Sequence, residues 1–180
     1  MTQVDITVSP DIADTIQALE ATSSQLQRAA IRALNKTARW LRTRITKETA
    51  EAFNIKQSLV RKTLVLVRAK RGSVQATVGQ AKRTGALNAI YLGQARQQAS
   101  GVRVARRHYD KAFIATMPRG FTGVFRRKPS SARLPIMPVQ IVITGKMADV
   151  MERLAEQPAK QQFNKLFERE LRFILRYEQR

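Results

Sequence analysis

Residues 112–143 constrain the fold more than any other part of the chain, because short apolar runs alternate here with turn residues. Three runs are predicted to be β-strands: residues 113–117, residues 124–125 with their flanks, and residues 139–143. Residues 118–121 fit a hairpin turn, since Pro fixes the turn entry and Gly supplies a positive φ. Further turn signals separate the runs, at Gly123 and residues 128–131. The stretch therefore predicts a small antiparallel sheet whose connections are rich in arginine.

The length of the chain suits one domain, which we predict to span residues 1–180. Cysteine is absent, so the fold is expected to form without disulfides or thiolate-bound metals. The sequence shows no signal-peptide pattern and no apolar stretch of the roughly 18 residues that a membrane span needs. A soluble protein without membrane contacts is expected.

The formal net charge of +20 is concentrated in the middle of the chain. Residues 1–51 and 149–180 each hold seven Lys and Arg against six Asp and Glu, whereas residues 52–148 hold nineteen against one, Asp110. A solvated surface usually mixes both signs, so this one-sided charge indicates a polyanionic neighbour. Nucleic acid and an acidic protein surface both fit that description.

Helical periodicity marks both ends of the chain. Residues 2–8 alternate as a strand, and Ser9 and Pro10 are typical of a helix start. A long helix is predicted over residues 24–52, with an apolar stripe at Leu26, Ala30, Ala33, Leu34, Thr37, Leu41 and Ile45. Near the C-terminus, two further faces are formed by Met147, Val150, Met151 and Leu154, and, beyond Pro158, by Phe163, Leu166, Phe167, Leu171, Ile174 and Leu175.

Between the helices the pattern is mostly that of strands. We expect a helical turn at residues 56–62, strands at 64–67, 74–78 and 89–92, and a basic hairpin tip at 69–73. Residues 80–88 and 94–111 are interpreted as long loops or an extended arm. The fold class is therefore α+β: a twisted antiparallel sheet with hairpin arms, packed against the long N-terminal helix and the C-terminal amphipathic helix.

The sequence contains few residues that could support catalysis. His108 is the one histidine and lies two residues from Asp110, a pair most simply interpreted as a charge-balanced contact. No zinc-protease, phosphate-loop or serine-hydrolase motif is present, and carboxylates for acid–base chemistry or oxygen-ligand metals are missing from the middle. We predict no enzyme activity, no cofactor and no metal site.

Two motifs carry a resemblance to a known family. One is the segment ALNKTA at residues 33–38, on the long helix. The other runs from residues 113–117 into GFTGVFRR at 120–127 and RLPI at 133–136. Together they resemble the prophage minor tail protein Z family, the tail completion proteins of long-tailed phages. A Gly-Pro-Ser that often follows the Leu-Pro-Ile segment in related neck proteins is replaced by Pro-Val-Gln at residues 138–140.

The resemblance implies a structural virion protein of the phage neck. Such a protein completes the tail and joins it to the head, as a hexameric ring around the DNA path. It implies contacts with further copies of itself, the tail terminator, the head-side connector and, without sequence preference, phage DNA. The expected location is the virion, with the host cytoplasm during assembly. The alternative is a free basic nucleic-acid-binding protein of architectural or ribosomal type.

A charge estimate favours acidic partners over DNA alone. A ring of compact subunits ~40 Å tall would enclose about 24 phosphates, against about 108 positive charges from six middle segments. Candidate contacts with DNA or an acidic partner are Lys70, Arg71, Lys82, Arg83, Arg103, Arg106 and Arg107. Candidate subunit-interface residues are Arg119, Phe121, Val124, Phe125, Arg126 and Arg127, where strand core is an equally good interpretation of Val124 and Phe125.

Overall fold

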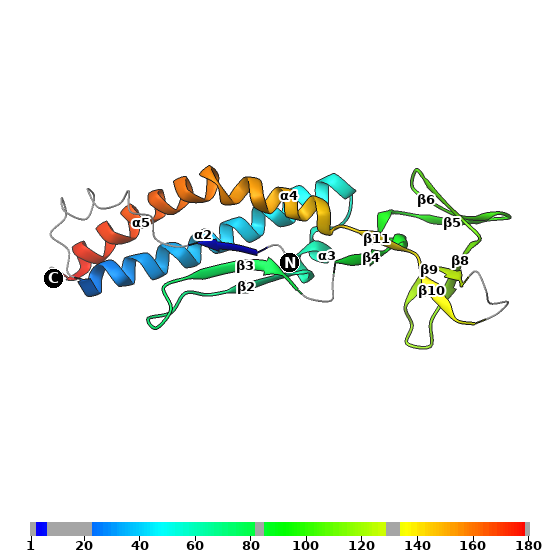
Figure 1. The fold of residues 1–180 in the computed structure, drawn as a ribbon, viewed down its shortest axis with the longest axis horizontal. Coiled ribbons are helices and arrows are strands. Elements are labelled where there is room, and N and C mark those ends of the chain that lie inside the picture. Colours follow the sequence, from blue (N-terminus) through cyan, green and yellow to red (C-terminus); the bar gives the residue numbers. More distant parts are fainter. Residues whose placement is uncertain (1–2, 7–22, 82–84, 129–133, 179–180) are drawn as a thin grey trace.

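The protein is elongated, with a helical body at one end and a β-rich head at the other (Figure 1). This computed structural model describes residues 3–6, 23–81, 85–128 and 134–178. The predicted helix that starts at Ser9 and Pro10 lies outside the described residues. A narrow two-stranded connector joins body and head, so the compact subunit assumed in the charge estimate is wrong.

Helix α2 (Ser23–Phe53) forms the backbone of the body. Its predicted stripe is confirmed: Ala33, Leu34, Leu41 and Ile45 are fully buried. Alanine and threonine fill the rest of the buried face, and their small side chains let neighbouring elements approach closely. The helix therefore has room for packing along more than one side.

Helices α4 (Thr144–Ala155) and α5 (Gln157–Glu178) pack against α2, in line with their predicted apolar faces. Pro158 follows the end of a helix as predicted, since α4 ends at Ala155 and a new helix begins at Gln157. It lies in the first turn of α5, where a missing N–H costs nothing. The expectation that the last helix covers the sheet is corrected, because α5 packs mainly on α2 and α4.

The sheet of the body has three antiparallel strands in the order β1-β3-β2. Strands β2 and β3 form the predicted basic hairpin, which is closed by a bridge between Lys70 and Ser73. Helix α3, the predicted helical turn, precedes β2 and contacts α2. The bounds are β1 Gln3–Ile6, α3 Gln57–Lys62, β2 Leu64–Val67 and β3 Ala76–Gln80.

The connector pairs β4 (Ala86–Asn88) with β11 (Gln140–Val142), so the prediction of a loop over residues 80–88 is wrong at residues 86–88. The predicted strand at residues 89–92 is wrong, because these residues form the short 3₁₀ helix η2 (Ala89–Leu92). The Asn88 side chain caps this helix by accepting a hydrogen bond from the Ile90 N–H at 3.0 Å. This capped helical turn buries Ala89 and Leu92, so a short apolar run can be buried without forming a strand.

The first sheet of the head corrects the interpretation of residues 94–111 as long loops or an arm. They form a three-stranded antiparallel meander in the order β5-β6-β7. Val102 and Val104 are fully buried, so alternate residues of the middle strand pack into the head. The strands are β5 Ala95–Gln98, β6 Gly101–Val104 and β7 Arg107–Asp110.

The second sheet of the head contains the predicted hairpin. Strands β8 (Ala112–Thr116) and β9 (Thr122–Arg127) pair antiparallel, and Gly120 in their turn has a φ of 79°. The third strand is β10 (Ile136–Pro138), not residues 139–143 as predicted. The third predicted run leaves this sheet, because its residues 140–142 form β11, which pairs with β4 in the connector.

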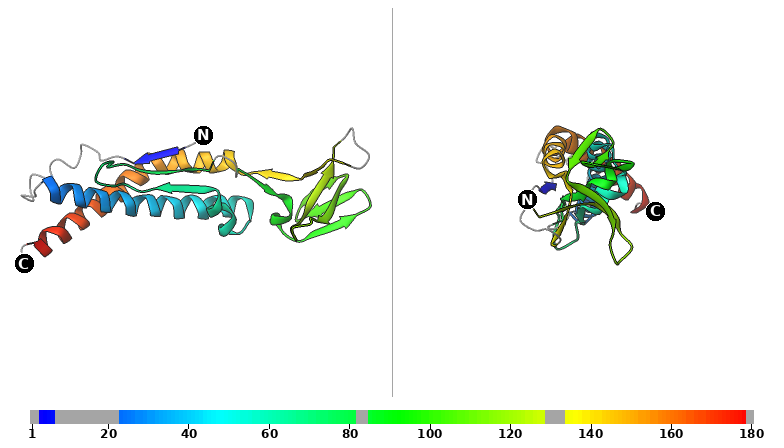
Figure 2. Two further views of the ribbon diagram at one scale, coloured as in Figure 1. Left: turned by 90° about the horizontal axis from the view of Figure 1, so that it is seen from below. Right: turned by 90° about the vertical axis from the view of Figure 1, so that its right-hand side faces the viewer.

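Two separate apolar cores result, one in the body and one in the head. The α+β class, the long first helix and the antiparallel pairing are confirmed, whereas the single central sheet is replaced by four small ones. End-on, the head stands over the end of the body (Figure 2). The extent of a single domain over residues 1–180 stays a prediction.

Candidate nucleic-acid and subunit interfaces

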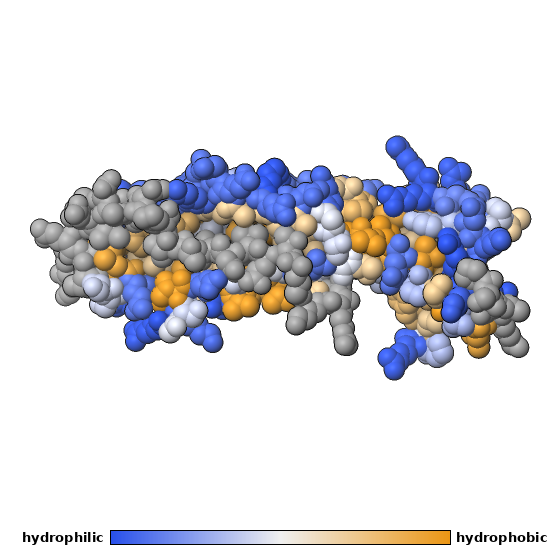
Figure 3. Space-filling model, in the orientation of Figure 1, coloured by the Kyte–Doolittle hydropathy of each residue, from blue (hydrophilic) through white to orange (hydrophobic). Residues whose placement is uncertain are grey.

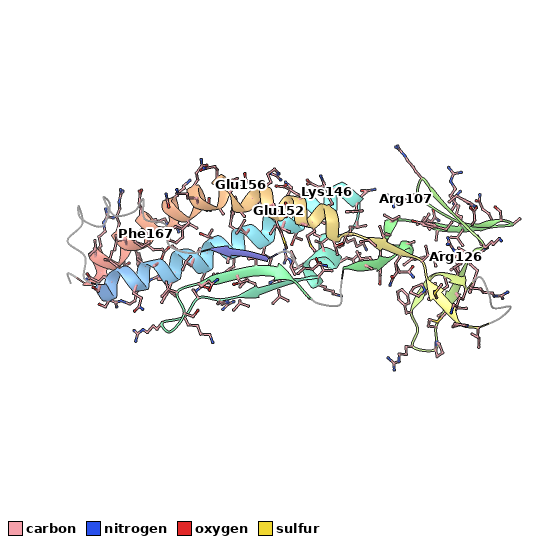
Figure 4. All side chains as sticks on the ribbon, viewed as in Figure 1. Arg107, Arg126, Lys146, Glu152, Glu156 and Phe167 are labelled. Carbon is pink, nitrogen blue, oxygen red and sulfur yellow. The ribbon has the colours of Figure 1, made fainter. Side chains whose placement is uncertain are left out.

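The predicted basic contacts fall into two groups at different places along the molecule. Lys70 and Arg71 lie at the tip of the β2–β3 hairpin, beside the helical body. Arg103, Arg106 and Arg107 lie on the meander of the head, where Figure 4 labels Arg107. The remaining two candidates, Lys82 and Arg83, lie outside the described residues. The sequence predicted a single basic segment in the middle of the chain. In the fold, the described candidates of that segment lie on two separate surfaces.

The hairpin tip is held to α2 by the side chain of Asn35. Its Oδ1 accepts a hydrogen bond from the Ala69 N–H at 3.0 Å, and its Nδ2 donates to the Ala69 carbonyl at 3.1 Å. A second contact runs from the Gln27 amide to the Arg71 carbonyl at 3.3 Å. These bonds fix the backbone of the tip, so that the exposed side chains of Lys70 and Arg71 project from a defined position.

A row of basic side chains crosses the exposed face of the meander. Arg103 on the middle strand is directly opposite Arg96 on β5 and His108 on β7. Its neighbours along the strand, Val102 and Val104, point into the core, so Arg103 points outward. Two arginines directly opposite each other repel, which an anion placed over the row would relieve. Arg96 was missed from the sequence because residues 94–111 were interpreted as loops.

His108 and Asp110 are neighbours on one face of the edge strand β7. The His108 Nε2 lies 3.1 Å from the Asp110 Oδ1 and 3.3 Å from the Ser100 hydroxyl. The Asp110 side chain is 83% exposed, so water competes for this pair. Across the described part of the chain, no three His, Cys, Asp or Glu side chains gather as metal ligands would. The contact fits the predicted charge balance.

The predicted subunit-interface residues divide into core and surface. Val124 and Phe125 are buried at 0% and 5% exposure, so strand core is their role within the subunit. Phe121 is 37% exposed, with its ring 6.3 Å from that of Tyr91 and 6.4 Å from that of Phe125. Three arginines stay exposed around it, at Arg119, Arg126 and Arg127. Figure 4 labels Arg126 on the head.

More apolar side chains are exposed on the head, at and beside its edge strand β10. Leu134 is 69% exposed and Met137, on the edge strand β10, is 43% exposed. Both belong to the segment that includes the Leu-Pro-Ile motif. Exposed apolar groups rimmed by arginines are typical of protein interfaces, so this side of the head extends the predicted contact surface.

The body carries an open groove of about 420 Å³ between α2 and the end of α5. Arg32 lies with its guanidinium 4.9 Å from the centre of the Phe173 ring, and it also pairs with the buried Glu170 at 2.9 Å. Aliphatic, aromatic and guanidinium groups make up the lining: Arg28, Ile31, Arg32, Arg71, Phe173, Ile174 and Tyr177. These groups bind apolar or anionic partners, and none of them is a nucleophile or a general base at neutral pH.

These features define an elongated structural subunit, whose described surfaces offer contacts with large partners. The chain matches the family model of prophage minor tail protein Z (GPZ) over residues 12–180, and it belongs to that family. It is therefore a structural protein of a bacteriophage tail and a component of the virion. No curated protein and no solved structure matches it. In the described residues, no helix is both long and apolar enough to cross a membrane.

Proposed function

We propose that this tail protein works at the neck, where it completes the tail and joins it to the head as a ring around the DNA path. The observation that carries the proposal is the positive charge of the parts that project from the helical body. Residues 54–85, which include the hairpin, hold eight Lys and Arg and no acid. Residues 86–143, which include the connector and the head, hold ten Lys and Arg and one acid.

A positively charged hairpin and head suit a subunit that lies between negatively charged partners. A ring subunit at the neck meets DNA on its inner side and other virion proteins at its ends and flanks. The facing Arg96 and Arg103 offer cations without a shaped recognition pocket, which fits phosphate contacts that ignore base sequence. Further copies of the chain, the tail terminator and the head-side connector are the proposed protein partners. Assembly takes place in the host cytoplasm.

The experiment is deletion of the gene from the phage, with the products of infection examined by electron microscopy. The proposal predicts filled heads and separate, full-length tails, which join once the protein is supplied from a plasmid. Joined and infectious particles without the protein would refute a role in joining. Tails of abnormal length, or no tails, would place the protein earlier in tail assembly.

A further inference from the structure

One face of the body sheet exposes two apolar side chains of strand β2. Strand β2 buries Leu64 and directs Val65 and Val67 to the opposite face, where they are 47% and 53% exposed. Their register partners on β3 are Gly79 and Thr77, so this face is flat and has small side chains. In Figure 3, hydrophobic residues lie along the side of the body where β2 and β3 run. We call Val65, Val67, Thr77 and Gly79 the β2 face.

Positive charge lies beyond both ends of strand β2. Five exposed basic side chains flank the strand, on α3 and in the hairpin tip: Arg61, Lys62, Arg68, Lys70 and Arg71. No acid occurs between residues 54 and 85 to compensate them. An apolar centre with a rim of one sign is suited to a partner that carries an apolar surface flanked by the opposite sign.

The chain itself carries side chains of the opposite sign on helix α4. Asp149, Glu152 and Glu156 are all exposed, and their spacing of three and four residues places them on one face. No ion pair joins them to a base within the described residues, whereas Arg153 beside them is paired with Glu48. Figure 4 labels Glu152 and Glu156 on this helix. We call these three acids the α4 stripe.

The two surfaces lie on opposite sides of the body. In Figures 1 and 2, α4 runs along one side and the β2–β3 hairpin along the other. A two-fold contact through either surface would bring like charges together. A contact between unlike surfaces joins each copy to the next, and it closes into a ring when the rotation allows.

We propose that the β2 face of one copy docks on the α4 stripe of the next copy, so that the subunits associate head to tail. The inference rests on the proposed ring and names the surfaces that build it. Opposite charges meet at every contact, and Val65 and Val67 are removed from water. Because a large part of the attraction is between exposed charges, association weakens as salt shortens the screening length from about 10 Å at 0.1 M to 3 Å at 1 M.

The first test uses two charge-reversed variants of the full chain. One carries Asp149→Lys, Glu152→Lys and Glu156→Lys, and the other carries Arg68→Glu, Lys70→Glu and Arg71→Glu. Light scattering and sedimentation measure their masses at low salt. We expect wild type to associate and each variant alone to lose association by about tenfold or more. Mixing the two variants restores it, because every contact again joins a basic surface to an acidic one.

Two results would overturn the inference. A wild-type protein that stays monomeric at low salt has no such contact. Variants that associate as well as wild type, or that stay monomeric when mixed, show that these surfaces do not meet. Circular dichroism and thermal melting of each variant check that the fold is kept.

A second test remains available if a charge-reversed variant does not fold. The natural chain has no cysteine, so single cysteines report contacts directly. Val67→Cys and Glu152→Cys chains, mixed and treated with a short bismaleimide, should give cross-linked dimers. Val142→Cys, 65% exposed on the connector, replaces Val67→Cys in the control and should give none. Equal cross-linking of both pairs would overturn the inference.

The same variants separate this inference from the proposed function. If deletion of the gene leaves heads and tails unjoined, but both charge-reversed variants restore joining, the proposed function stands and the docking surfaces are wrong. If deletion has no effect on joining, the proposed function is wrong whatever the association state.

Discussion

Asn88 pairs with Val124 in the way that a neighbouring strand would. Its Nδ2 donates to the Val124 carbonyl at 3.0 Å, and its Oδ1 accepts from the Val124 N–H at 2.9 Å. Asn88 ends a connector strand and Val124 is in the middle of the head hairpin, so one side-chain amide fixes the head to the connector. Gly123 leaves the room for this contact, since a Cβ there would lie 3.0 Å from the Asn88 Nδ2.

Replacing Asn88 should therefore loosen the head. Asn88→Ala removes the partners of the buried Val124 N–H and carbonyl groups, and unpaired buried groups of this kind suggest a loss of about 2–4 kcal/mol in the free energy of unfolding. Urea denaturation with hydrogen exchange on the head amides measures the change. Gln140→Ala is the matched control, because Gln140 faces Asn88 in the connector register and its side chain is exposed. An unchanged Asn88→Ala melting curve would contradict this role.

A similar clamp predicts a local effect in the body. Asn35→Ala removes both side-chain bonds to Ala69, so the hairpin tip should open more often while the helices stay packed. We expect a loss of about 1–2 kcal/mol and faster amide exchange at Ala69. Asn35→Asp separates the two bonds, because a carboxylate can accept from the Ala69 N–H but cannot donate to its carbonyl. Exchange at Ala69 that is the same in all three chains would show that the clamp does not hold the tip.

The helix faces give a prediction about the whole body. Leu34 and Phe167 are 0% and 1% exposed, so Leu34→Asp and Phe167→Asp each bury a charge without a partner. Either substitution should cost more than about 4 kcal/mol and unfold the body. Phe173→Asp on the same helix as Phe167 is the control, since Phe173 is 43% exposed. Thermal melting followed by circular dichroism measures all three, and a native transition in Phe167→Asp would mean that the assigned faces are wrong.

Sequence periodicity predicted the elements whose apolar pattern is regular over many residues. It missed the elements that are held in place by the hydrogen bonds of a single side chain. The stripe of α2 and the β8–β9 hairpin follow from spacing and turn residues, and both were predicted correctly. The meander was missed because its strands are only four residues long and two of them are mainly polar. Gln97 holds it in place by accepting from the Ile114 N–H at 3.0 Å and donating to the Gly101 carbonyl at 2.9 Å.

Strand partners could not be predicted from the pattern either. Residues 139–143 are apolar enough for a strand, but alternation does not specify which strand they join. They pair with β4, whose last residue Asn88 bonds to Val124 of the head through its side chain. The same limit applies to the site: Arg96 and Arg103 become neighbours through pairing, which no spacing in the sequence indicated.

The basic side chains of the meander predict how the protein binds DNA. We expect binding to duplex DNA to be independent of sequence and to weaken steeply with salt, because phosphate contacts dominate. Reversing Arg103, Arg106 and Arg107 to Glu should lower the slope of log affinity against log salt by about 2–3, as roughly three phosphate contacts are lost. Fluorescence anisotropy over a salt series measures the slope. The Lys70→Glu and Arg71→Glu double variant compares the hairpin with the head.

The opposite result would change the interpretation of the protein. Affinity that survives high salt and prefers one sequence would favour the free nucleic-acid-binding protein over a neck subunit. Equal slopes for the head and hairpin variants, per charge reversed, would mean that overall charge matters and the position of these arginines on the meander does not.

The exposed ring of Phe121 predicts a defect in assembly without a defect in folding. Phe121 rests on Tyr91 and Phe125 at the surface of the head, and Arg126 is exposed on the neighbouring strand. Phe121→Ser with Arg126→Glu should therefore leave the core around Val124 intact, while the apolar contact is lost and a rim charge is reversed. Phage carrying this variant should give filled heads and separate tails, counted by electron microscopy. Tyr177→Ser with Arg176→Glu is the matched control, an exposed aromatic and its neighbouring arginine at the far end of the body. Normal yields of joined particles from the Phe121 variant would contradict an interface role, and so would a subunit that fails to fold, because the ring would then belong to the core.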